Sequence, residues 1–280
     1  MPLFFMVSGF FCSSSMQLTW ADFLRKKGTT LLLPCFVWGV IIACCRFQSW
    51  EILVRNIFLP TRWPFWFFKT LFVVQIVAYI SQRIAFLLSK DEKWVLTIAI
   101  MISLAVALIP YLGMARIMIP IFWIGYIIKR YYTQFVQCHR LIAIIASILF
   151  IGTYCLWYWV TGSDFTQTEI VLKLFKWILA VTGSLSVISL MHEIKATRPF
   201  ISIIGMSTAG IYILQTFVLE KGLHMLFQKY IDLNNWSLYL NYLLMLGISI
   251  VLIVVITWIY KQLCENKYIA LIFFGYELKK

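Results

Sequence analysis

Charged side chains are scarce in this chain of 280 residues. Asp, Glu, Lys and Arg together make up 12% of the sequence, about half of the share of roughly 25% that is usual in soluble domains. Apolar residues make up 62%, and no polar stretch is long enough to form a separate soluble domain. The composition excludes a soluble globular protein and predicts one integral membrane domain over residues 1–280.

Acidic residues are the scarcer charge, with 11 Asp and Glu against 24 Lys and Arg, which gives a net charge of +13. No basic run is long enough, or sufficiently interleaved with aromatic residues, to form a nucleic-acid groove. We therefore expect no nucleic-acid partner. In a membrane protein, Lys and Arg gather instead in the cytoplasmic connections and set the orientation of the polypeptide.

Metal-ligand patterns are also absent. The seven cysteines form no C-x-x-C pair and follow no metal-ligand spacing, so we expect small buried hydrophobic side chains and no metal site. The three histidines, His139, His192 and His224, are each expected in a solvated connection between helices. A secretory signal peptide is excluded, because the N-terminus lacks a basic region and a small-residue cleavage site ahead of a soluble chain.

Apolar runs of membrane length recur along the sequence and predict an all-α, polytopic bundle of transmembrane helices. A spanning helix needs about 20 mostly apolar residues. Pro110 is expected to end or kink the helix before it, and Pro120 to lie in the first turn of the next. We expect about nine membrane segments, a partial one at 1–11 and eight others at 28–46, 65–88, 93–112, 116–132, 141–161, 170–191, 199–219 and 237–261.

Lys and Arg concentrate on one side of the predicted bundle. The connections on the opposite side hold 6 of them. The positive-inside rule therefore places the C-terminus in the cytoplasm. We expect the protein in the cell's inner membrane. The polypeptide then begins outside, partway through a helix, so we expect one further helix upstream and ten spans in all. The cytoplasmic set holds 15 basic residues, in the segments 13–27, 82–93, 129–140, 192–198 and the tail from Lys261.

Four motifs stand in order along the sequence: residues 1–11 (MPLFFMVSGFF), 23–27 (FLRKK) with 33–38 (LPCFVW), 66–72 (WFFKTLF) and 210–215 (GIYILQ). Together they resemble the acyltransferase-3 family of membrane acyltransferases. That family carries H-M-P-L-F-F-x-I-S-G-F, a basic loop followed by L-I-P-Y-x-x-W, then W-F-L-x-x-L-F, and a late helix with the motif G-I-Y-L-L-H. The resemblance covers nearly the whole sequence.

The resemblance implies transfer of an acyl group, usually acetyl, from coenzyme A to a sugar or a similar acceptor. The family's helical Arg and catalytic His precede the first motif, so the catalytic His is expected upstream of Met1 and the catalytic residue is unknown in this sequence. Gln215 stands where the family commonly has His. We expect the polypeptide as it stands to be truncated and weakly active, and none of its histidines to act as the base.

Arg25, Lys26 and Lys27 lie at the expected cytoplasmic end of a helix. Clustered cations and helix ends suit phosphate groups. The resemblance implies acetyl-CoA as the acyl donor, so these three residues are the candidate clamp for its phosphates. Positive-inside anchoring explains the same cluster equally well, and both interpretations stay open.

Lys69 is a charge inside an expected membrane helix, close to Trp66. Such a charge faces a cavity or a partner, or its side chain reaches the interface from the helix end. Gln75, deeper in the helix, is expected to face the bundle interior, because lipid offers an amide no hydrogen-bond partner. Tyr212 and Gln215 of the late helix either bind neighbouring helices or line a pore. The candidate pore residues are Trp66, Lys69, Gln75, Tyr212, Gln215 and Glu220.

The sequence therefore predicts a membrane O-acyltransferase that moves an acetyl or other acyl group from acyl-CoA to a sugar hydroxyl of a surface polysaccharide or glycolipid. Glu220 is a candidate ligand for the sugar hydroxyls. The alternative is a polytopic transporter or flippase of sugar-containing amphiphiles, although no pairing of inverted halves supports it. The expected partners are the acyl-CoA donor, a carbohydrate acceptor and the lipid bilayer, and no pattern predicts an oligomeric state.

Overall fold

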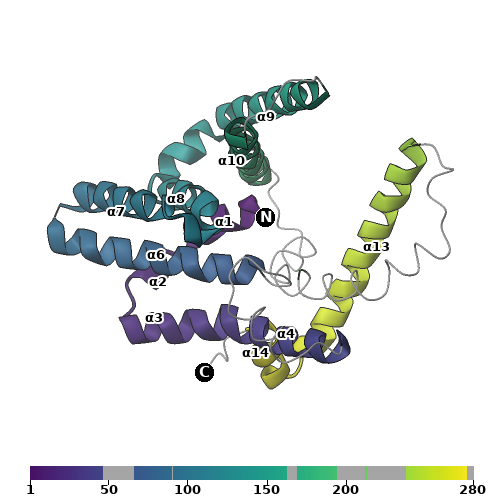
Figure 1. The fold of residues 1–280 in the computed structure, drawn as a ribbon, viewed down its shortest axis with the longest axis horizontal. Helices are drawn as coiled ribbons and strands as arrows, with labels where there is room; N and C mark the ends of the chain where they lie inside the picture. The colour runs from purple at the N-terminus through teal and green to yellow at the C-terminus, as the bar shows by residue number, and fades with distance from the viewer. Residues whose placement is uncertain (47–65, 90, 163–168, 194–211, 213–237, 276–280) are drawn as a thin grey trace. The chain divides into compact units, whose positions relative to one another are not determined.

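All regular elements in the described part of the protein are helices (Figure 1). The predicted all-α fold is therefore confirmed. The segment expected at 199–219 lies outside the described residues, apart from Tyr212. The computed structural model describes residues 1–46, 66–89, 91–162, 169–193, 212 and 238–275.

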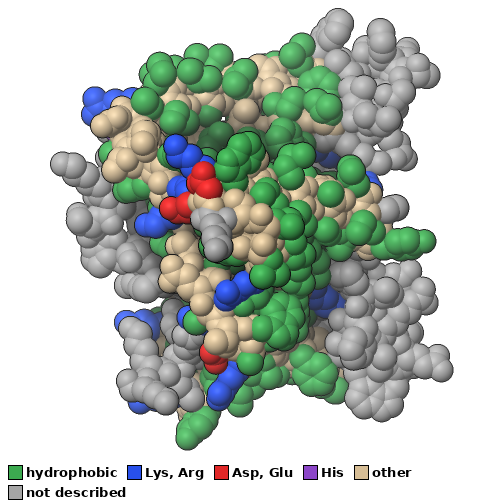
Figure 2. Space-filling view, turned by 90° about the vertical axis from the view of Figure 1, so that its left-hand side faces the viewer, with side chains coloured by type: hydrophobic (Ala, Val, Ile, Leu, Met, Phe, Trp, Pro, Cys, Tyr) green, Lys and Arg blue, Asp and Glu red, His purple; other side chains and the backbone are tan. Residues whose placement is uncertain are grey.

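Three helices in the described ranges are long and apolar enough to cross a membrane: Trp66–Leu88, Tyr132–Tyr158 and Leu174–His192. The second of these buries little of its apolar surface inside the protein, and Leu141 and Ile148 are 61% and 64% exposed. Figure 2 shows hydrophobic side chains over much of the described surface on one face. Lipid covers exposed apolar surface of this extent, which supports the predicted membrane character.

The polypeptide forms two compact units, the first from Met1–Leu24 with Thr70–Ala196 and the second from Arg25–Lys69 with Thr197–Lys280. Helices α3 (Trp20–Lys27) and α6 (Trp66–Leu88) contribute to both units. The first unit also contains α1 (Pro2–Phe11), α2 (Ser13–Met16), α7 (Glu92–Ala107), α8 (Ala115–Arg130), α9 (Tyr132–Gly162) and α10 (Glu169–Glu193). The second unit also contains α4 (Leu33–Arg46), α13 (Leu238–Cys264) and α14 (Lys267–Phe274).

Helices α1 and α8 of the first unit pack backbone against backbone at two glycines. A Cβ atom added to Gly9 would lie 1.9 Å from the carbonyl oxygen of Phe122, and one added to Gly125 would lie 1.8 Å from that of Met6. Small residues allow membrane helices to approach this closely. The contact holds the N-terminal segment in the interior of the unit, where Met6 is fully buried.

In the second unit, α14 docks on α4 through Trp38. The indole Nε1 of Trp38 donates a hydrogen bond of 2.9 Å to the carbonyl oxygen of Phe273. The neighbouring ring of Phe274 contacts Tyr260 of α13 edge-on, at a centroid distance of 4.8 Å. These contacts join the C-terminal helix to both longer helices of the unit.

A π-helical turn at Gly28–Leu32 joins α3 to α4. Pro34 follows this turn, and its missing N–H and its ring are incompatible with an uninterrupted α-helix. Gly275 ends α14 with a φ of 69°, close to the backbone of Thr30. Only glycine fits this position, because any Cβ would lie 2.4 Å from the Thr30 carbonyl oxygen.

Several predicted boundaries are wrong at the helix ends. The connection expected at 129–140 is mostly helical, because α9 begins at Tyr132, and the one expected at 13–27 contains α2 and α3. Polar residues with long side chains continue a helix readily after its apolar run ends. Pro120 lies inside α8 rather than in its first turn. Helix α7 ends at Ala107, ahead of Pro110 and before the expected bound of 112.

A candidate acyl-transfer site

The start of α6 carries the buried charge of Lys69. Its side chain is only 7% exposed, and Phe67 and Phe68 beside it are 5% and 3% exposed. The ammonium group lies close enough to Cys35 of α4 for an electrostatic interaction with its thiol. A lysine that reached the interface would be exposed, so the structure agrees with the alternative in which Lys69 faces the protein interior.

Tyr212 contacts the same turn of α6. The centroid of its ring lies 5.5 Å from that of Phe67 and 5.7 Å from that of Phe68. Trp66 is half-buried and meets Phe67 edge-on at 6.4 Å. The structure thus brings three of the candidate pore residues to one aromatic cluster: Trp66, Lys69 and Tyr212.

Gln75 lies six residues further along α6, about 9 Å along the helix axis. It is 5% exposed, so it lies in the interior as predicted, and its Nε2 donates a hydrogen bond of 2.7 Å to Ser8 Oγ of α1. Its role in a pore stays a prediction. The other two candidate pore residues, Gln215 and Glu220, lie outside the described residues.

Arg25, Lys26 and Lys27 form the last turn of α3. The hydroxyl of Thr29 donates to the carbonyl of Arg25, and that of Thr30 donates to the carbonyl of Lys26, both at 2.9 Å. The helix dipole favours cations at a helix C-terminus, so the cluster can stabilise α3 as well as bind phosphate. Consecutive side chains on a helix point about 100° apart. The three cations can therefore contact several phosphate groups more easily than a single one.

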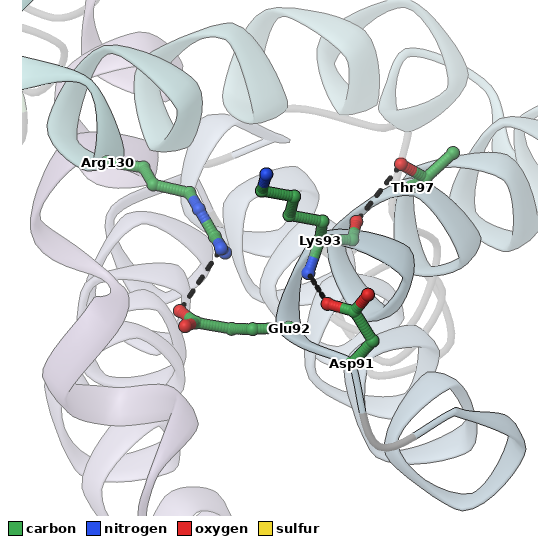
Figure 3. Close-up of polar contacts among 5 residues, drawn as sticks. All are labelled: Asp91, Glu92, Lys93, Thr97 and Arg130. Atoms are coloured by element: carbon green, nitrogen blue, oxygen red, sulfur yellow. Dashed lines mark hydrogen bonds and ion pairs between the residues drawn. The ribbon is translucent and has the colours of Figure 1, made fainter.

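Sequence reasoning missed a polar site between α6, α7 and α8. Arg130 of α8 forms an ion pair of 3.1 Å with Glu92 of α7, and the side chain of Asp91 caps α7 by accepting a hydrogen bond from the backbone N–H of Lys93 (Figure 3). The ion pair borders a pocket of about 40 Å³. The lining residues are spread over 82–130 on three helices, so no local motif marks the pocket.

The comparison with known families decides what this protein is. Residues 1–261 match the acyltransferase-3 family, described as an acyltransferase domain. The chain belongs to this family. No curated protein and no solved structure matches it.

Membership of the acyltransferase-3 family confirms the resemblance carried by the four sequence motifs. It also shows that the protein is a membrane acyltransferase and that the enzyme is of the O-acyltransferase type. The match includes both the basic turn of α3 and the aromatic cluster around Lys69. These are therefore parts of the acyltransferase domain itself.

Two histidines of the acyltransferase are not the solvated loop residues that the sequence predicts. His139 lies in α9 and His192 in the last turn of α10, and their half-buried rings meet edge-on at a centroid distance of 4.7 Å. The prediction is wrong because both helices extend past their expected ends. The sequence offered one sign that these two residues could meet, because both were expected on the same side of the membrane. His224 lies outside the described residues.

Proposed function

We propose that this acyltransferase moves an acyl group, expected to be acetyl, from acyl-CoA to a hydroxyl group of a carbohydrate. The acceptor belongs to a surface polysaccharide or glycolipid, or to its precursor. The protein lies in the inner membrane with its C-terminus in the cytoplasm, so acyl-CoA approaches from the cytoplasmic side. Family membership over residues 1–261 supports the reaction type, and the usual chemistry of the family suggests the donor and the acceptor.

The observation that carries the acceptor site is the burial of Lys69. A charge inside a membrane helix costs about 2.5–3.5 kcal/mol even on the lowest scale, and such residues are typically functional. Lys69 is 7% exposed, on a turn whose Phe67 and Phe68 contact Tyr212. An ammonium donor beside aromatic rings suits a sugar, because the rings cover its apolar face and the ammonium binds its hydroxyl oxygens.

The donor site is assigned to the basic turn of α3. Arg25, Lys26 and Lys27 are consecutive cations at a predicted cytoplasmic helix end. Coenzyme A carries a pyrophosphate and a 3′-phosphate, and separate cations pointing in different directions match separate phosphate groups.

The triple variant R25Q/K26Q/K27Q is expected to bind coenzyme A about a hundredfold more weakly than the wild type. Each charge-assisted hydrogen bond contributes about 1.5–3 kcal/mol, so the loss of two such bonds accounts for this factor. Isothermal titration calorimetry on the purified protein in nanodiscs measures the affinity directly. It does not require turnover.

A matched control separates phosphate binding from membrane anchoring. The variant K93Q/K261Q/K267Q removes the same charge from the same predicted side of the membrane and is expected to bind coenzyme A like the wild type. If both triple variants keep the wild-type affinity, the basic turn only orients the polypeptide. If the wild-type protein binds no acyl-CoA and instead carries sugar amphiphiles across vesicle membranes, the transporter alternative replaces the proposal.

A further inference from the structure

Two side chains that line the pocket between α6, α7 and α8 carry buried polar atoms that have no hydrogen-bond partner among the described residues. Trp123 is 2% exposed, and its indole Nε1 has no hydrogen-bond partner among the described residues. The same holds for Oε1 of Gln82, whose side chain is also hydrogen-bonded to Tyr126. The large majority of buried polar side-chain atoms in proteins are paired with another protein group or with ordered water. Gln82 and Trp123 both line this pocket, so one small group bound there can pair with both atoms.

The two atoms define the chemistry of that ligand. An indole N–H can only donate, and an amide oxygen can only accept, so the bound group must accept from Trp123 and donate to Gln82. An amide, a hydroxyl or a water molecule does both, whereas a carboxylate offers no donor and an ammonium no acceptor. The charge of Arg130 at the pocket is already balanced by Glu92, 3.1 Å away, which also favours a neutral group.

The size of the pocket limits how much of a ligand enters. A cavity needs about 10–15 Å³ to hold one water molecule, so about 40 Å³ holds a group of a few atoms. A nucleotide or a sugar ring is too large to enter whole. A short stretch of a narrow, linear molecule fits, with the rest of the ligand outside.

We propose that this pocket binds an amide group of the pantetheine arm of acyl-CoA. The Nε1–H of Trp123 donates to the amide carbonyl, and the amide N–H donates to Oε1 of Gln82. Ala99 and Val95, both buried, form the apolar wall beside the arm. The predicted topology puts this end of the three helices on the cytoplasmic side, where the donor arrives. The identity of the ligand rests on the proposed function, whereas the need for a donor–acceptor group rests on the pocket alone.

The test compares three probes on purified protein in nanodiscs: coenzyme A, pantetheine and adenosine 3′,5′-bisphosphate, which lacks the arm. Trp123→Phe removes the indole donor and keeps an aromatic ring. It is expected to weaken binding of coenzyme A and of pantetheine about tenfold each, the usual effect of one lost hydrogen bond, and to leave binding of the bisphosphate unchanged. Gln82→Leu is expected to give the same pattern. The two variants give independent readings if either folds poorly.

Matched controls remove the same groups outside the pocket. Trp94→Phe changes a tryptophan of α7 that is 62% exposed, and Gln137→Leu changes an exposed glutamine of α9. Both are expected to bind all three probes like the wild type. The temperature shift that pantetheine produces in thermal unfolding gives a second measurement, expected in the wild type and the controls and lost in Trp123→Phe.

The outcomes separate this assignment from the proposed function. If wild type and Trp123→Phe bind pantetheine and coenzyme A equally, the pocket assignment is wrong and the donor proposal stands. If methyl glucoside, added as a further probe, binds with a dependence on Trp123 and pantetheine does not, the pocket takes a sugar hydroxyl and the pantetheine assignment is overturned. If the wild type binds neither coenzyme A nor the bisphosphate, the proposed donor itself is wrong.

Discussion

Gly125→Ala is expected to destabilise the folded protein strongly. The new Cβ would lie 1.8 Å from the carbonyl oxygen of Met6, a backbone atom that no side-chain rotation can move. Overpacking of a core costs about 1–3 kcal/mol, and more where two backbones must separate. We expect the unfolding temperature in detergent to fall by about 10 °C, with a matching loss of the monodisperse peak in fluorescence-detected size-exclusion chromatography.

Gly152→Ala provides the control for this substitution. A Cβ added at Gly152 of α9 meets nothing within 4 Å, and alanine is a better helix former than glycine by about 1 kcal/mol. This variant is expected to keep or slightly raise the unfolding temperature. An unchanged unfolding temperature in Gly125→Ala would show that α1 and α8 do not pack as described.

Lys69→Met is expected to lower kcat/KM for acyl transfer by tenfold to a hundredfold, the range that corresponds to about 1.5–3 kcal/mol for a charge-assisted hydrogen bond. The folded protein should be at least as stable as the wild type, because methionine removes a buried charge without leaving a large cavity. Loss of transfer without loss of stability is the signature of a binding role. If Lys69 only supported the fold, Lys69→Met would lower the stability of the protein and leave kcat/KM near the wild-type value.

Lys176→Met is the matched control, since it removes a second lysine from a membrane helix. Lys176 of α10 is exposed, and its ammonium lies 5.8 Å from the ring centroid of Trp157. Its loss is expected to leave kcat/KM within about twofold of the wild type. Both variants are measured in protein expressed from the gene's own locus. A wild-type rate in Lys69→Met would remove Lys69 from the acceptor site.

The helices that apolar runs define were predictable from the sequence. The span expected at 65–88 is observed as Trp66–Leu88, because the apolar run and the helix coincide there. Helix α9 began nine residues earlier than its predicted start, at Tyr132 instead of 141. Hydropathy predicts which residues lie in the hydrocarbon layer of the membrane. Polar residues with good helix propensity can extend the helix beyond that layer.

The parts of the site that depend on tertiary packing could not be predicted. Lys69 was recognisable because a lone charge in an apolar run is conspicuous. Trp123 and Gln82 were not, because a tryptophan or glutamine in a helix is ordinary until its neighbours leave it unpaired. The contact of Gly125 with Met6 depends likewise on two helices that meet only in the fold.

Acetyl transfer tests the central claim most directly. Inverted membrane vesicles that contain the protein, expressed from its own locus, are incubated with acetyl-CoA labelled in the acetyl group, and label is counted in the carbohydrate fraction. We predict incorporation that depends on the protein, is released by mild alkali as expected of an O-ester, and falls in both R25Q/K26Q/K27Q and Lys69→Met. Folded protein that leaves all the label on acetyl-CoA, while unmodified sugar amphiphiles cross the membrane, would contradict the account.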